Sequence, residues 1–203
     1  MDINSINIKT ESHIVTPESF DVGSAVGVDK RYWFIAIVKN NTEKSAAQKL
    51  HKAGYDCFVA TQKDVRVWRT GRRVSVDRVV ITSAVFIYCT ECERRIVVNE
   101  PYISRFLTNK AAASTVGGRP VATIPEVQIR NLRFMLGHSD TPVGLVDRTY
   151  GRGDRVRVIR GSLCGLEGEV LVSNEGQSEL LVRLDILGCA KCAIDLVDVE
   201  PIR

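Results

Sequence analysis

Six cysteines and three histidines are the residues of this chain whose side chains could bind a metal ion or act as nucleophiles. Two Cys-x-x-Cys pairs stand out, Cys89 with Cys92 and Cys189 with Cys192. Four thiolates satisfy tetrahedral zinc, but zinc ribbons place their pairs about 15–20 residues apart, and these pairs fall in different predicted domains. Neither pair lies in the βαβ context typical of redox motifs. The sequence favours small buried or edge-lying cysteines, with no metal and no cofactor, and a zinc-stabilised adaptor is the alternative.

The histidines do not complete a catalytic site. His13, His51 and His138 fall in the N-terminal segment, on the surface of a predicted helix and in a predicted linker. None neighbours a nucleophile in the sequence, and no glycine-rich phosphate loop follows a predicted strand. The sequence therefore predicts a protein that is not an enzyme.

Charge is distributed unevenly along the 203 residues, whose formal net charge is +4. Residues 1–29 carry a net charge of −4, residues 30–137 a net charge of +11, and residues 138–203 a net charge of −3. A basic segment of this size favours a nucleic-acid backbone or an acidic protein surface as partner, with simple solvation of the surface as the alternative.

A basic hairpin is predicted in the middle of that segment, with Thr70-Gly71 as its turn. Arg66 falls on the strand face opposite Val65 and Val67, so that its charge projects outward. We predict that the basic residues of this hairpin bind nucleic acid: Lys63, Arg66, Arg69, Arg72, Arg73 and Arg78.

Hydrophobic periodicity predicts the elements that position these residues. Residues 33–39 form an almost continuous apolar run, typical of a strand buried on both faces. A helix is expected next, opened by a capping box of Asn40 and Glu43. A second capping box, Thr90 with Glu93, opens a short helix, and a third helix starts at Pro125. Further strands are expected at residues 55–61, 65–68, 72–78, 79–88 and 103–108.

Two segments lack such periodicity. Residues 1–29 are interpreted as a mobile tail and residues 138–151 as a linker. The sequence thus predicts an α+β fold with two domains. Residues 30–137 form an antiparallel sheet with flanking helices, and residues 152–203 form a small SH3-like β-barrel.

The start of the second domain carries a recognisable pattern. In residues 151–172 a strand that alternates arginine with valine is followed by Gly161, the apolar Leu166 and Gly168. The two glycines mark points where the backbone takes a positive φ or closely approaches another strand. This segment resembles the KOW motif. Together with the opening Trp33-Phe34-Ile35-Ala36, the order of domains resembles a NusG-type transcription elongation factor, an NGN domain followed by a KOW domain, over residues 30–203. The acidic segment before Trp33 indicates a specialised paralogue, similar to the UpxY-type antiterminators of capsular polysaccharide operons in Bacteroides-like bacteria.

The resemblance implies a role in transcription elongation and antitermination. The NGN-like domain would bind the clamp helices of RNA polymerase through an apolar recess and reduce pausing or termination. The positions that match the family's recess are Trp33, Phe34, Ile81, Ala84 and Val85, although the Pro, the Gly and both aromatics of the family's turn are absent here. This interpretation requires an apolar recess between Trp33 and the bend at residues 81–85. A core position is the alternative for these residues.

The resemblance also implies further partners. The basic hairpin would contact non-template or upstream DNA, with nascent RNA a further candidate. Ile186, Leu187 and Gly188 match the turn by which KOW domains bind the termination factor Rho or a ribosomal protein of the small subunit, and plugging of the barrel end is the alternative. No apolar stretch approaches the roughly 18 residues that span a bilayer, and no secretory signal opens the chain. We therefore expect a cytoplasmic protein without membrane contact.

An RNA-binding translation or ribosome-associated factor is the alternative function. Its sheet would serve as an RRM-like platform, which needs exposed aromatic side chains on the central strands. Phe34 and Phe86 are the candidates, and both lie within apolar runs.

Overall fold

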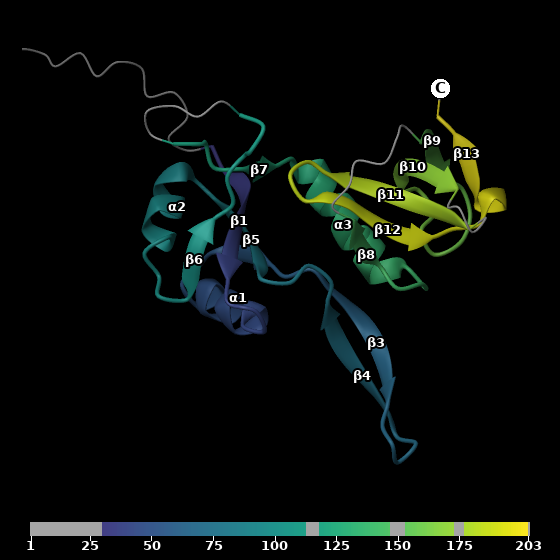
Figure 1. The fold of residues 1–203 in the computed structure, drawn as a ribbon, viewed down its shortest axis with the longest axis horizontal. Coiled ribbons are helices and arrows are strands. Elements are labelled where there is room, and N and C mark those ends of the chain that lie inside the picture. Colours follow the sequence, from purple (N-terminus) through teal and green to yellow (C-terminus); the bar gives the residue numbers. More distant parts are fainter. Residues whose placement is uncertain (1–29, 113–117, 147–152, 173–176, 203) are drawn as a thin grey trace, which may run out of the picture.

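The computed structural model describes residues 30–112, 118–146, 153–172 and 177–202, and the predicted tail at residues 1–29 lies outside them. Figure 1 shows a mixed N-terminal lobe, a sheet-rich C-terminal lobe, and a two-stranded hairpin that projects away from both. The predicted α+β class is confirmed, with an antiparallel N-terminal sheet flanked by helices and a C-terminal sheet that resembles a small barrel.

The N-terminal lobe is built on an antiparallel sheet with the strand order β2-β5-β1-β6, in which β7 also pairs with β1. The apolar run predicted at residues 33–39 is the central strand β1, which pairs with β5 from Tyr32 to Ile37. Aromatic and branched aliphatic side chains dominate both strands, as suits strands covered on two faces. The bounds of the strands are β1 (Tyr32–Val38), β2 (Asp56–Phe58), β5 (Ala84–Cys89), β6 (Ile103–Phe106) and β7 (Thr123–Ile124).

Helices cover both faces of this sheet. Helices α1 (Glu43–Lys52) and α2 (Glu91–Val97) pack on the face that carries Phe34 and Val85, and α3 (Glu126–His138) packs on the face that carries Trp33 and Phe86. Successive side chains of a strand alternate between its faces, so each central strand contributes to two separate clusters of buried residues. Full burial of one such side chain contributes about 1.5–3 kcal/mol. Among the described residues, no helix has the length and apolar character needed to cross a bilayer.

The two predicted capping boxes have different outcomes. In α2 the box is confirmed, because the Glu93 N–H donates to Thr90 Oγ1 at 3.2 Å and the Thr90 N–H donates to Glu93 Oε2 at 2.8 Å. The box of Asn40 and Glu43 is wrong, because α1 begins at Glu43, whose carboxylate accepts from the backbone N–H of Ser83 at 2.6 Å. Glu43 is buried and thereby ties the start of α1 to the turn before β5, where Ser83 has a φ of 58°.

The C-terminal lobe, within the described ranges, is an antiparallel sheet with the strand order β13-β9-β10-β11-β12-β8. Two expectations for its glycines are confirmed. Gly161 has a φ of 79°, and a Cβ on Gly168 would lie 2.5 Å from the carbonyl oxygen of Leu181 on the neighbouring strand. The bounds are β8 (Gly144–Val146), β9 (Asp154–Val158), β10 (Glu167–Val172), β11 (Ser178–Leu184), β12 (Gly188–Ala193) and β13 (Val199–Pro201), with a short 3-10 helix at Leu196–Asp198.

The two lobes meet along α3. This helix lies beside β11 (Figure 1), and its buried residue Leu132 belongs to the same cluster as Leu180 and Val182 of β11. The backbone N–H of Asp185 donates to the side-chain oxygen of Gln128 on α3 at 2.9 Å. The predicted linker at residues 138–151 contains β8, which pairs with β12, and its residues 147–151 lie outside the described ranges.

Candidate nucleic-acid interface

Strands β3 (Thr61–Val67) and β4 (Arg73–Val79) form the projecting hairpin, which we name the arm (residues 61–79). Its turn lies where Thr70-Gly71 predicts it. The Trp68 N–H donates to the carbonyl oxygen of Arg72 at 2.9 Å, and the Gly71 N–H donates to that of Trp68 at 2.8 Å. Gly71 has a φ of 78°, the left-handed conformation that closes a three-residue hairpin loop. The residues of the turn therefore determine locally where the two strands of the arm reverse direction.

The base of the arm is anchored by Gln62, a buried polar residue. Its side-chain nitrogen donates to the carbonyl oxygens of Thr141 at 2.9 Å and Ser139 at 3.3 Å. Its side-chain oxygen accepts from the Val143 N–H at 2.8 Å and from Arg78 at 3.1 Å. Gln62 could not be identified from the sequence, because its backbone partners are about 80 residues away and no local pattern marks them.

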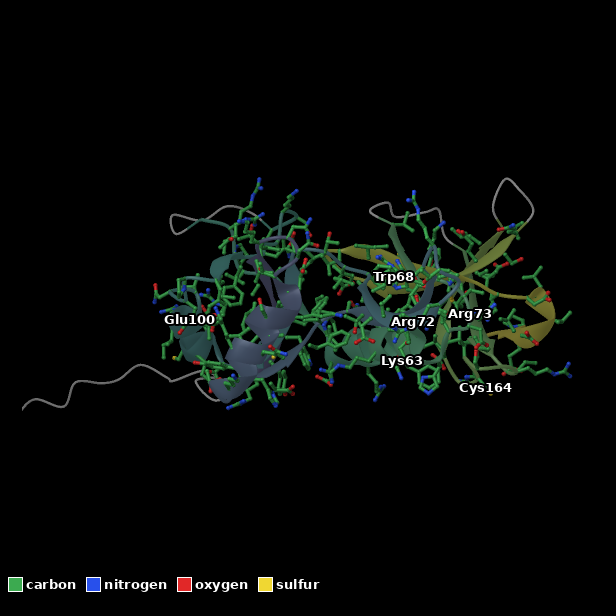
Figure 2. All side chains as sticks on the ribbon, turned by 90° about the horizontal axis from the view of Figure 1, so that it is seen from below. Lys63, Trp68, Arg72, Arg73, Glu100 and Cys164 are labelled. Carbon is green, nitrogen blue, oxygen red and sulfur yellow. The ribbon has the colours of Figure 1, made fainter. Side chains whose placement is uncertain are left out.

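The basic residues predicted to bind nucleic acid divide into two groups. Arg78 is half-buried at the base and donates to Gln62 and to the carbonyl oxygen of Val143 at 3.0 Å, so its position is structural. The other five are exposed along the arm: Lys63, Arg66, Arg69, Arg72 and Arg73. Figure 2 views the molecule from below, and Lys63, Arg72 and Arg73 lie on the arm in the middle of the view, between Glu100 and Cys164 on the two lobes.

Apolar side chains on the arm are exposed as well. Val65, Val67 and Trp68 are 60%, 63% and 65% exposed. Arg66 is exposed as predicted, yet the opposite face with Val65 and Val67 covers no core. The sequence analysis placed Trp68 on a strand without assigning it a role. The signal that could have identified Trp68 is its position beside a turn and between arginines, where an aromatic side chain can stack on a base.

The five residues predicted to bind RNA polymerase are all buried: Trp33, Phe34, Ile81, Ala84 and Val85. They do not share one face. Trp33, Ile81 and Ala84 belong to the cluster beneath α3, whereas Phe34 and Val85 belong to the cluster beneath α1 and α2. The structure therefore does not gather them into a single recess.

Trp33 nevertheless borders a cavity of about 370 Å³ at the junction of the lobes. Its indole N–H donates to the carboxylate of Glu126, and Arg133 lies over its ring with the guanidinium carbon 4.8 Å from the ring centroid. The wall also includes Tyr32, Tyr88 and, from the C-terminal lobe, Asp185. The cavity thus lies beside Trp33, and the bend at residues 81–85 does not line it.

Comparison with known families identifies this lobe. The family model described as transcription termination factor NusG matches residues 31–133, about half of the chain. The chain belongs to the NusG family. The matched region contains the sheet, the arm and most of α3, and the C-terminal sheet follows it.

Solved structures similar to this NusG-family chain include two described as "Domain interaction in Thermotoga maritima NusG" and "Crystal Structure of MjSpt4:Spt5 complex conformation B". The first is 18% identical with a TM-score of 0.41, and the similarity covers 86% of this chain and 98% of that one. The second is 15% identical with a TM-score of 0.27, covering 84% and 96%. No curated protein matches the chain.

The C-terminal turn predicted to bind a partner lies at the junction of the lobes in this NusG-family protein. Ile186, Leu187 and Gly188 are half-buried, and Leu187 packs against the cluster that includes α3. The adjacent Asp185 is bonded to Gln128 of α3. The turn that was predicted to contact another protein is thus tied to the N-terminal lobe through the neighbouring Asp185.

The alternative functions gain no support from the geometry. The described residues contain no group of three or more His, Cys, Asp or Glu side chains that could hold a metal ion, so the two Cys-x-x-Cys pairs do not come together. Burial raises the pKa of the Cys89 thiol to about 12 and also raises the pKa of Cys189 and Cys192, as expected of thiols buried in a protein core. Phe34 and Phe86 are buried under helices, so they offer no platform for stacked bases.

Proposed function

We propose that this NusG-family protein is a transcription elongation or antitermination factor that binds RNA polymerase through its N-terminal lobe and reduces pausing or termination. The observation that carries the proposal is the exposed basic arm within the family-matched region. The protein acts by binding and not by catalysis. The proposed domains are residues 30–137 and 152–203, joined by residues 138–151, within which β8 pairs with the sheet of the second domain.

A specialised role, similar to that of UpxY-type antiterminators at capsular polysaccharide operons, is part of the proposal. It is supported by the net charge of −4 on residues 1–29, directly before the family-matched region. Such a factor works in the cytoplasm without membrane contact. Transcription of a polysaccharide-type operon with and without the protein tests this part, and equal read-through on every template contradicts it.

The rim of the cavity beside Trp33 is the polymerase contact that the structure supports best. Phe34, Ile81, Ala84 and Val85 are buried, so acidic substitutions there would unfold the lobe and test nothing about binding. Tyr32, 36% exposed, lines the cavity, and Val127, 48% exposed, follows Glu126 of its wall on α3. The apolar surfaces of these two residues are available to the clamp helices of the polymerase.

Co-purification with core polymerase tests this contact. Tyr32→Ala combined with Val127→Asp is expected to reduce the polymerase retained by the tagged protein. Ile96→Asp is the matched control, because Ile96 is 62% exposed on α2, which covers the opposite face of the sheet. Equal retention by both variants would place the contact elsewhere.

The arm is the proposed contact with non-template or upstream DNA, or with nascent RNA. Arginine binds phosphates with two parallel hydrogen bonds and stacks on unpaired bases. In pausing assays, glutamine at Arg66, Arg69, Arg72 and Arg73 should abolish the effect of the protein on pausing. The control removes the same charge elsewhere, at the exposed Lys39, Lys52, Arg105 and Lys110. If both quadruple variants behave alike, the arm contributes only net charge.

The turn at Ile186, Leu187 and Gly188 is the proposed contact with Rho or a ribosomal protein of the small subunit. The bond of the neighbouring Asp185 to α3 implies that a partner bound at this turn competes with the junction of the lobes. Leu187→Asp should weaken both contacts. A pull-down in which Rho or the ribosomal protein is retained equally by this variant would remove the turn from the proposal.

A further inference from the structure

Trp68 is unusual among the large side chains of this protein. The chain has two tryptophans, and Trp33 is 2% exposed whereas Trp68 is 65% exposed. Exposing an indole to water loses the free energy that its burial would provide. Figure 2 shows Trp68 on the arm together with Arg72 and Arg73. An exposed indole among arginines suggests a binding surface.

The register of the arm defines this surface. Val67 lies opposite Arg73 in the ladder, and the Trp68 N–H donates to the Arg72 carbonyl oxygen, so Trp68 and Arg72 form the last pair before the turn. Cross-strand partners project to the same face, and so do residues two apart on one strand. Arg66 therefore shares a face with Trp68 and Arg72. One face of the tip presents an indole ring between two guanidinium groups.

The side chains of Trp68, Arg66 and Arg72 are not engaged by other side chains in the described part of the chain. Across the residues that the structure describes, no carboxylate forms an ion pair with Arg66 or Arg72, and no ring or cation lies over the indole of Trp68. The arm as a whole carries six basic and two acidic residues. The face thus offers two donors for anionic groups beside an uncovered aromatic ring.

We infer that Trp68 stacks on an unpaired base of single-stranded nucleic acid while Arg66 and Arg72 hold the flanking phosphates. The inference rests on the proposed function of the arm as a nucleic-acid contact, and it names the form of nucleic acid that the arm selects. Inside a duplex, neighbouring base pairs cover both faces of each base, so away from the duplex ends a protruding indole finds a base to stack on only in a single strand. The positive charge of the arm favours a polyanion over an apolar protein surface.

Fluorescence anisotropy with the full-length protein tests the inference. The probes are a labelled 12-nucleotide DNA strand, an RNA strand of the same sequence, and the DNA duplex. Trp68→Ala is expected to weaken binding to the single strands about 5- to 150-fold, the range of base–aromatic stacking, and to change duplex binding less than twofold. Trp68→Phe should retain most of the affinity. The difference between the DNA and RNA strands identifies which unpaired strand the arm prefers.

Val65→Ala is the matched control, because Val65 is equally exposed on the opposite face of the same strand. Its affinities should equal those of the unmodified protein. Trp68 is exposed, so its substitution should leave the unfolding temperature nearly unchanged. The difference in tryptophan fluorescence between the unmodified protein and Trp68→Phe gives the emission of Trp68. Saturation with the single strand should quench this emission and protect the indole from quenching by acrylamide.

Arginine variants separate this inference from the proposal on which it rests. Arg66→Gln with Arg72→Gln should weaken both single-strand and duplex binding and reduce the slope of log affinity against log salt by about 1.4 for single strands. If the arginine variant weakens binding while Trp68→Ala does not, the arm binds nucleic acid without stacking and the inference is overturned. If neither variant matters, the arm is not the interface and both ideas fail. Tighter binding to the duplex than to the single strand would also overturn the inference.

Discussion

Replacement of Gln62 by alanine should destabilise the protein more than any substitution at an exposed polar residue. The amide makes four hydrogen bonds, of 2.8 to 3.3 Å, to the segment after α3 and to Arg78. Each bond contributes about 1 kcal/mol net, and stranding the buried Val143 N–H costs about 1–3 kcal/mol. Because part of the site admits water once the side chain is gone, we expect a loss of about 2–4 kcal/mol.

Thermal and urea unfolding measure this loss. For a protein of this size, 1 kcal/mol corresponds to about 2–4 °C, so the unfolding temperature should fall by about 4–16 °C. Gln62→Leu keeps most of the volume and removes the hydrogen bonds, so it separates packing from polar contacts. Gln48→Ala on the exposed side of α1 is the control, and its effect should stay within about 0.5 kcal/mol.

Amide hydrogen exchange supplies a local readout for the same variant. The Val143 N–H is bonded to Gln62 and buried, so its exchange should accelerate in Gln62→Ala while amides of the central strand β1 stay protected. If Gln62→Ala unfolds within about 0.5 kcal/mol of the unmodified protein, the anchor contributes nothing measurable. Recovery of full stability by Gln62→Leu would show that volume matters and the four hydrogen bonds do not.

Three further predictions concern the fold. Gly168→Ala should cost about 1–3 kcal/mol in urea unfolding, because its Cβ must displace the neighbouring backbone, whereas Gly137→Ala, which meets nothing within 4 Å, should be neutral or stabilising. Glu43→Ala should cost about 1.5–3 kcal/mol through the lost charge-assisted bond to the Ser83 N–H, with a smaller loss for Glu43→Gln, and equal losses would contradict this reading. Burial raises the pKa of Cys89 from 9.0 to about 12, so the folded state retains a proton that the unfolded state releases. Its contribution to stability should therefore be complete below pH 9 and fall between pH 9 and 12 by up to about 1.4 kcal/mol per pH unit, and Cys89→Ala should flatten that part of the profile.

Local signals in the sequence located most elements of the fold. The strand predicted at residues 33–39 is β1 (Tyr32–Val38), the third helix begins beside Pro125, and the arm turns at Thr70-Gly71. Turn residues, helix caps and short apolar runs determine the backbone conformation of residues only a few positions away. The local sequence is therefore enough to predict the elements that they form. Long-range partners explain the failures. Glu43 is satisfied by a backbone group 40 residues away, so its spacing from Asn40 was misleading.

Exposure was harder to predict than secondary structure. The alternation of side chains along a strand shows which residues share a face. It does not show which other elements cover that face. In β1 both Trp33 and Phe34 are buried, because helices lie on both faces of the sheet. In the arm the equally apolar Val65 and Val67 remain exposed, because no other described element covers the outer part of the projecting ribbon. The candidate recess was therefore assigned to core residues, whereas the exposed Trp68 received no role.

The anchored base and exposed tip of the arm follow from one physical constraint. A two-stranded hairpin is marginally stable in water without a core, and this one buries little of its own apolar surface. Gln62 and Arg78 supply the missing stability at the base by bonding to the segment after α3. Substitutions at the base should therefore change stability and, through the orientation of the arm, nucleic-acid binding. Substitutions at the tip should change binding alone, and a loss of stability in Trp68→Ala would mean that the indole supports the arm and is not free for a ligand.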